Sequence, residues 1–135
     1  MGIADGVTQL DDETIAFAHR MFDLARSGGT EELAGNLTAG LPANLTNDKG
    51  DTLLILAAYH NQVGTVRALL EHGADPNRVN DRGQTALSAA VFRQNPDTVQ
   101  ALLAAGADPD GGTPSAVATA DYFKLPEMAA LLGPH

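Results

Sequence analysis

The sequence predicts an all-α repeat solenoid, a stack of helix-turn-helix units placed side by side. The first reason is internal repetition: the stretch 69–77 returns as 102–110, and 14 of 30 positions agree between 48–77 and 81–110. The second is that apolar residues in each copy recur at spacings of three and four, which places them on one helical face. The third is the constant shift of 33 residues, because such a period indicates units that bury their apolar faces against one another.

Each full repeat predicts two short helices between turns. In the first copy the polar stretch 47–51 forms a turn, and Thr52 is predicted to cap a helix over Leu53–His60 with its side-chain oxygen. Gly73 is predicted to end the second helix, because a residue without a Cβ adopts the left-handed conformation at little cost. In the second copy Pro96 can start the corresponding helix. The apolar face of the second helix carries Val66, Leu69 and Leu70.

The repeated frame reads Gly-x-Thr-x-Leu, then Ala-Ala in the first copy, then Val-x-x-Leu-Leu-x-x-Gly-Ala-Asp. At a 33-residue period this frame resembles the ankyrin repeat, strongly over Asn47–Gly111 and, with degenerate ends, over about 11–132. One departure is clear: the family's Thr-Pro-Leu-His is replaced by the segments 52–55 and 85–88, which lack the histidine that ties neighbouring repeats. The resemblance implies protein–protein recognition on a concave surface made of finger tips and the exposed side of each first helix.

We expect one domain over 1–135, with capping units around two full repeats. The N-terminal cap is predicted over 11–46: a helix starting near Asp11 and stopping at Ser27-Gly28-Gly29, then a second helix capped by Thr30. Full repeats are predicted over 47–79 and 80–112, and the C-terminal cap over 113–135. These boundaries would give about eight helices and at least two β-turn fingers.

The C-terminal cap departs from the 33-residue period. Gly111–Pro114 replaces the longer finger, Thr113-Pro114 is similar to the family's helix start, and Pro126 can begin the last helix. Placing Leu131-Leu132 on Leu102-Leu103 gives a shift of 29 and predicts a deletion of about four residues.

Composition restricts the function classes. There is no cysteine, which excludes disulfides and thiolate-bound metal centres. Acidic residues outnumber basic ones 17 to 8, and this disfavours nucleic acids and anionic membranes, which need a cationic face. No apolar run approaches a membrane span, and residues 1–5 lack the features of a secretion signal. We expect a cytoplasmic monomer with no membrane and no nucleic-acid partner.

The sequence offers no candidate catalytic, cofactor or metal-binding residue. The four histidines form no His-x-x-x-His pair, and Gly111-Gly112-Thr113 lacks the Gly-Lys-Ser/Thr ending of a phosphate loop. No Gly-x-Ser-x-Gly is present. We therefore expect no cofactor and no enzyme activity.

The resemblance implies a candidate partner-binding surface. Tyr59 and Phe92 occupy the same repeat position, so we expect the two rings to lie side by side, either as an exposed anchor for a partner or packed against neighbouring repeats. The remaining phenylalanines (Phe17, Phe22, Phe123) are predicted to pack in the core or caps, and Arg26 is predicted to border the surface. The predicted partner-binding residues are Asp48, Lys49, Asp51, Tyr59, His60, Val79, Asp81, Arg82, Gln84, Phe92, Arg93 and Tyr122.

The leading hypothesis is a non-catalytic adaptor, inhibitor or regulator that binds a partner protein, and the net charge of −9 suggests a partner with a basic surface. Two alternatives stay open. One is a small enzyme or ligand-binding protein without a recognisable motif, which would need a closed pocket. The other is a structural module of a larger ankyrin assembly, which the capping units at both ends argue against.

Overall fold

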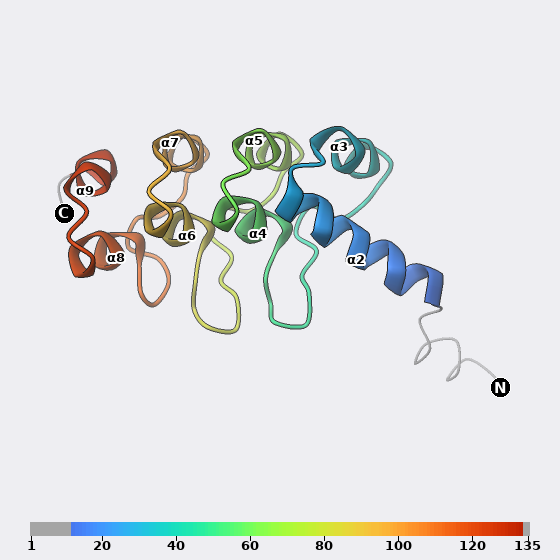
Figure 1. Cartoon of the computed structure of the whole chain (residues 1–135), viewed down its shortest axis with the longest axis horizontal. Helices are drawn as coiled ribbons and strands as arrows, with labels where there is room; N and C mark the ends of the chain where they lie inside the picture. Colours follow the sequence, from blue (N-terminus) through green and yellow to red (C-terminus); the bar gives the residue numbers. More distant parts are fainter. Residues whose placement is uncertain (1–11, 134–135) are drawn as a thin grey trace.

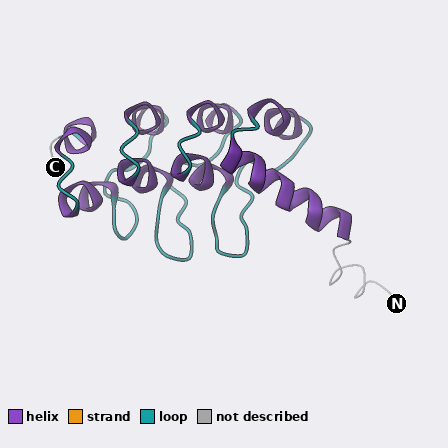
Figure 2. Ribbon diagram, viewed as in Figure 1, coloured by secondary structure: helices purple, strands orange, loops and turns teal. Residues whose placement is uncertain are grey.

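The computed structural model describes residues 12–133, and the predicted all-α repeat solenoid is confirmed over this part of the chain. Between residues 12 and 133, eight helices follow one another in pairs (Figures 1 and 2). Asp11, residues 1–5 and His135, on which some of the sequence predictions rest, lie outside the described residues. The helices are α2 (Asp12–Ser27), α3 (Thr30–Thr38), α4 (Leu53–Tyr59), α5 (Val63–Glu71), α6 (Ala86–Phe92), α7 (Pro96–Ala104), α8 (Ala116–Tyr122) and α9 (Pro126–Leu132).

The helices form two layers (Figure 1). The inner helices α2, α4, α6 and α8 make one row, and the outer helices α3, α5, α7 and α9 make the other. Each inner helix packs on the next inner helix and on its own outer helix. The loops before α4, α6 and α8 project away from the outer row as fingers. We propose the unit boundaries 11–46, 47–79, 80–112 and 113–135, each of which encloses one helix pair among the described residues.

The core lies between the two rows. Leu69 of α5 and Leu102 of α7 are 0% exposed, as the repeat predicted. Ala57 and Ala90, at the same position of α4 and α6, are also fully buried. A side chain of one methyl group lets neighbouring inner helices approach closely, so the small residues set the spacing of the stack.

Threonine caps start the inner helices of the full repeats. Thr52 Oγ1 accepts a hydrogen bond from Ile55 N, and Thr85 Oγ1 accepts one from Ser88 N, both at 3.0 Å. Ser88 stands where the family has its histidine, and its Oγ accepts a bond from Thr85 N, which completes a capping box. Ile55, at the same position of α4, is buried in the core instead. Local capping and apolar packing thus occupy the two positions where the histidine is missing.

Backbone hydrogen bonds join adjacent fingers. Asp81 N donates to Lys49 O at 3.0 Å, and Thr113 N donates to Gly83 O at 2.8 Å. Gly83 has a φ of +78°, and a Cβ there would lie 2.8 Å from the Thr113 carbonyl oxygen. A side chain at this position would therefore both strain the backbone and separate the two fingers.

Asparagines join adjacent pairs on the outer side. Asn44 Oδ1 accepts a hydrogen bond from Asp75 N at 2.7 Å, and Asn77 Oδ1 accepts one from Asp108 N at 2.8 Å. The same side chain of Asn77 donates to Gly106 O. The asparagines recur with the repeat because each satisfies backbone groups of the following pair.

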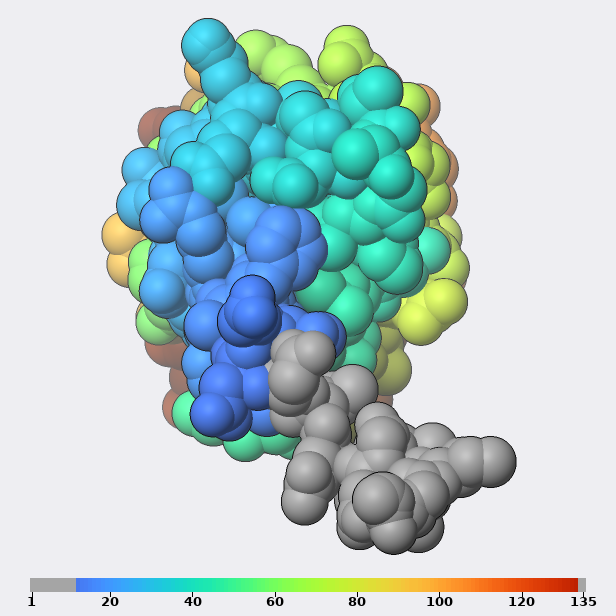
Figure 3. Space-filling view, turned by 90° about the vertical axis from the view of Figure 1, so that its right-hand side faces the viewer, coloured from blue at the N-terminus to red at the C-terminus, as the bar shows by residue number. Residues whose placement is uncertain are grey.

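Helix α2 is longer than the other inner helices, with 16 residues against 7 in α4. Figure 1 shows it running beyond the stack, and Figure 3 shows the end of the stack where it lies beside α3. Phe22 is buried, as predicted, but Ile15 and Phe17 are exposed. An open groove of about 790 Å³ lies between this overhang and residues Leu45–Asp48. The packing predicted for Phe17 is therefore wrong, because α2 buries side chains only over its second half.

Two predicted helix starts are wrong. Gly29, rather than Thr30, is the N-cap of α3; Thr30 is the first helical residue, and its hydroxyl bonds to that of Thr65 at 2.7 Å. In the last unit Ser115 caps α8, and Thr113-Pro114, joined by a cis peptide bond, belongs to the finger. Because Gly28 and Gly29 already turn the chain before α3, the Thr30 hydroxyl is not used as a cap and bonds to Thr65 of the next unit instead.

The predicted alignment of the last unit is also wrong. The outer helices α7 and α9 start at Pro96 and Pro126, and the inner helices α6 and α8 start at Ala86 and Ala116, so both shifts are 30 residues. The last unit therefore lacks three residues rather than four, and all three are missing from the finger. Leu132, which is buried, takes the place of Leu102.

Candidate functional site

The structure brings most of the predicted residues to one face, formed by α4, α6, α8 and the fingers, which we call the inner surface. Tyr59, His60, Phe92 and Arg93 are exposed there at the ends of α4 and α6, and Tyr122 is exposed at the end of α8. The fingers carry the other predicted residues that are exposed: Asp48, Lys49, Val79, Asp81 and Arg82. Gln84 is half-buried at the base of the second finger.

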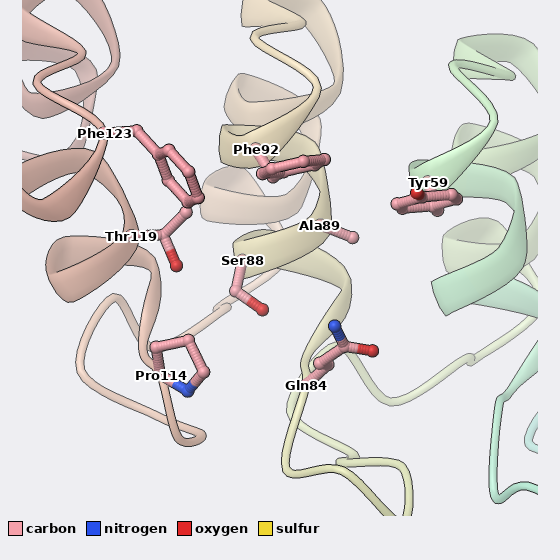
Figure 4. A pocket seen from close by; sticks show the side chains of 8 residues that line it. All are labelled: Tyr59, Gln84, Ser88, Ala89, Phe92, Pro114, Thr119 and Phe123. Atoms are coloured by element: carbon pink, nitrogen blue, oxygen red, sulfur yellow. The ribbon is translucent and has the colours of Figure 1, made fainter.

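An aromatic row crosses the inner surface. The Tyr59 and Phe92 rings are nearly parallel, at 5°, with centroids 6.3 Å apart, and Figure 4 shows both edge-on. Phe123 meets Phe92 at an angle of 68° with centroids 5.3 Å apart. The three side chains are 42%, 44% and 49% exposed. The rings therefore contact one another across three units and still offer nearly half of their surface to a partner.

A small groove lies beneath this row, lined by residues of α4, α6 and α8 and of the fingers before α6 and α8 (Figure 4). Its volume is about 260 Å³, and it is open to solvent on one side. Phe92 and Phe123 border it at the ends of α6 and α8, and Pro114 and Gln84 lie toward the fingers. Pockets that enclose small ligands have volumes of about 300–1,000 Å³, so this groove is sized for part of a ligand. The lining residues are Tyr59, Gln84, Ser88, Ala89, Phe92, Pro114, Thr119 and Phe123.

A buried hydrogen-bond network holds Gln84 in place. Asn80 Nδ2 donates to Asp51 Oδ1 at 2.7 Å and to Gln84 Oε1 at 2.9 Å. Asn80 Oδ1 accepts from the backbone N–H groups of Arg82 and Gln84, which fixes the orientation of the amide. Asp51 is only 7% exposed. The sequence placed Asp51 among the partner contacts, but the structure buries its carboxylate between two fingers, where it can act only through Asn80.

Charge at the inner surface differs from that of the whole chain. Arg93 Cζ lies 5.5 Å from the centroid of the Tyr59 ring, and His60 packs edge-on against the same ring at 5.4 Å. Partial burial, together with the charges of Arg26 and Arg93, lowers the pKa of His60 and so disfavours its charged form. Arg26 pairs with Asp23 at 2.9 Å, whereas Arg93 pairs with no carboxylate of residues 12–133.

The acidic excess lies mostly on other parts of the molecule. At the finger tips Asp48 and Asp81 are balanced by Lys49 and Arg82. The outer helices carry five acidic residues, Glu31, Glu32, Glu71, Asp97 and Glu127, against Arg67 alone. The net charge therefore does not describe the surface that carries the aromatic row.

Sequence reasoning missed several residues of this site. Phe123 was expected in packing, yet it is exposed and extends the aromatic row. The 30-residue shift places it at the repeat position of His60 and Arg93, directly after the inner helix, so a correct alignment of the last unit would have identified it. Asn80 gave no signal of its own, because its role depends on the contact between two fingers.

Other classes of site have little support in the described part of the chain. Within 12–133 no group of three or more His, Asp or Glu side chains is placed to hold a metal ion. No helix in the same range is both long and apolar enough to cross a membrane.

Comparison with known proteins agrees with this architecture. The model of a family described as ankyrin repeats (3 copies) matches residues 21–112. A segment of 59 residues, 44% of this chain, is 54% identical to a Pseudomonas aeruginosa protein named as an ankyrin repeat protein, PA3287. The aligned segment is 34% of that protein, so the chain spans about a third of the length of this relative.

Proposed function

Since the chain belongs to the ankyrin repeat family, we propose that it recognises a partner protein on the inner surface and catalyses no reaction. Ankyrin repeats are generally protein–protein interaction modules, and the family is typically non-enzymatic. In this proposal the chain acts as an adaptor, inhibitor or regulator, and its effect on the partner follows from occupying the partner's surface.

The observation that carries the proposal is the exposed aromatic row beside Arg93. Tyr59, Phe92 and Phe123 form one continuous strip across three units. Trp, Tyr and Arg are enriched among the few residues that supply most of the binding energy in protein interfaces, and an aromatic ring buries a large area when it is covered. Rings that already contact each other lose little further freedom on binding, which favours affinity.

The groove supports protein recognition over small-ligand binding. Its volume of about 260 Å³ and its open side suit one side chain of a partner, not a whole cofactor. The flanking exposed rings extend the contact area beyond the groove, as a peptide or protein surface requires.

The test compares two variants that each replace three exposed side chains, on opposite faces of the stack. The inner-surface variant carries Tyr59→Ala, Phe92→Ala and Arg93→Ala. The outer-helix variant carries three alanines at the exposed positions Arg67, Glu71 and Gln100 of α5 and α7. Circular dichroism and thermal melting would show whether both variants stay folded.

Each protein is immobilised and used to capture partners from a lysate of its native host, with identification by mass spectrometry. We expect proteins captured by the wild type to be lost by the inner-surface variant and kept by the outer-helix variant. Capture that survives the inner-surface changes but fails with the outer-helix changes would refute the assignment of the binding face.

A further inference from the structure

The groove beneath the aromatic row is shaped for one large apolar side chain. Tyr59 borders it on the α4 side and Phe123 on the α8 side, with Phe92 between them. Ala89 and Pro114 add further apolar surface (Figure 4). Its volume of about 260 Å³ is below the range of small-ligand pockets. An occupant that enters with one side chain must leave its backbone and its neighbouring side chains at the rim.

A hydrogen-bond donor is available at this rim. Gln84 Oε1 is occupied by the amide of Asn80, so the Gln84 amide nitrogen is directed the other way, toward Phe92 and the groove (Figure 4). No acceptor for this nitrogen is present among residues 12–133. The hydroxyl protons of Ser88 and Thr119, in contrast, are donated to the carbonyls of Thr85 and Ser115. The amide nitrogen of Gln84 is therefore available to an acceptor from outside the chain.

A cationic group lies on the same face. Arg93 follows α6 directly after Phe92, and its guanidinium lies over the Tyr59 ring. This cation–π contact limits its motion, and it has no carboxylate partner in the described chain. A guanidinium offers paired N–H donors that match the two oxygens of a carboxylate.

We propose that the inner surface binds an acidic segment of a partner protein. One large apolar side chain of the segment fills the groove, and neighbouring Asp or Glu carboxylates accept hydrogen bonds from Gln84 and pair with Arg93. This inference rests on the proposed function and names the chemistry of its partner. It also replaces the basic partner suggested by the net charge of −9, because the available groups at the site are donors and a cation.

The buried network has a defined place in this proposal. Asp51 holds Asn80, Asn80 holds Gln84 Oε1, and Gln84 then presents its N–H groups to the ligand. Asp51 is therefore a positioning residue that never touches the partner.

The experiment uses random dodecapeptides displayed on phage and selected on the purified full chain. Selected sequences are synthesised with a fluorescent label, and their affinities are measured by fluorescence polarisation. We expect enrichment of Asp and Glu around one Leu, Phe or Trp, with binding that weakens as salt rises. Gln84→Glu and Arg93→Glu should each weaken binding by about tenfold or more, because a carboxylate then meets a carboxylate.

A matched control carries the same change of charge on the outer layer. Gln100 of α7 is exposed, and Gln100→Glu should leave the affinity within about twofold, since distant surface charges are screened. Equal losses for Gln84→Glu and Gln100→Glu would overturn the local assignment.

The outcomes separate this inference from the proposed function. Selected peptides that are basic or uncharged, yet lost by the inner-surface variant, would overturn the acidic partner and leave the binding face intact. If no selected peptide depends on the inner-surface residues, both are overturned.

Discussion

Thr98 has a buried hydroxyl that the fold leaves without a partner. The residue is 0% exposed, and its Oγ1 has no hydrogen-bond partner in the described structure. Its equivalent in the previous unit, Thr65, is paired with Thr30 at 2.7 Å. In the following unit the 30-residue shift places Met128 at this position, and a thioether offers only a weak acceptor. The repeat therefore retains threonine in a unit where its hydroxyl makes no hydrogen bond.

Replacing Thr98 by valine should stabilise the protein. An unsatisfied buried polar group costs about 1–3 kcal/mol, and the added methyl group contributes up to about 0.8 kcal/mol of apolar burial. The two side chains have the same branched shape and similar helix propensity, and the bond from Thr98 N to Asn95 Oδ1 is unaffected. The site around the Thr98 side chain fits a hydroxyl more closely than a methyl group, which offsets part of this stabilisation. We therefore expect the free energy of unfolding to rise by about 1 kcal/mol, or Tm by roughly 3–5 °C.

The matched control is Thr65→Val, which makes the same chemical change one unit earlier. It removes the hydrogen bond between Thr65 and Thr30, and the Thr30 hydroxyl then has only the Gly28 carbonyl, at 3.3 Å, as a partner. We therefore expect the free energy of unfolding to fall by about 1 kcal/mol. Urea denaturation followed by circular dichroism gives both values. The reasoning is refuted if the two substitutions change stability in the same direction, or if Thr98→Val destabilises by 1 kcal/mol or more.

Two other predictions follow from burial and charge. Leu69→Ala and Leu102→Ala should each lower the free energy of unfolding in urea by about 2–5 kcal/mol, because both side chains are fully buried. Leu103→Ala, at a half-buried position of α7, should cost clearly less, and equal losses at Leu102 and Leu103 would contradict the assigned core. Because the pKa of His60 is lowered in the folded state, the unfolded chain binds protons more readily, so stability should fall as pH drops from about 7 to about 5. His60→Gln should remove this part of the decrease, and an unchanged pH profile of stability would contradict the prediction.

The sequence determined the repeat architecture because its signals are local. Thr52 caps its helix through the N–H of Ile55, three residues along the chain; Gly73 ends a helix because it adopts the left-handed conformation; and Pro96 starts a helix. Each of these depends on the few residues around it. The 33-residue period then fixed the stacking, since units with the same apolar positions bury the same faces, and the burial of Leu69 and Leu102 followed.

The tertiary structure decided what depends on contacts between units. Thr30 was expected to cap its own helix, but it bonds to Thr65 of the next unit. Asp51 was expected at the surface, but the neighbouring finger covers it and Asn80 binds its carboxylate. A repeat pattern gives the type of residue at each position, but it does not give the distance between one finger and the adjacent finger.

The last unit also separates what the sequence determined from what the tertiary structure decided. The sequence indicated a shortened finger, but only the helix starts at Ala116 and Pro126 fixed the shift at 30 and placed Phe123 beside Phe92. The sequence by itself thus determined the solenoid and two of the three rings of the aromatic row. Only the tertiary structure decided the third ring, the groove and the direction of Gln84, because each is set by how one unit packs on the next.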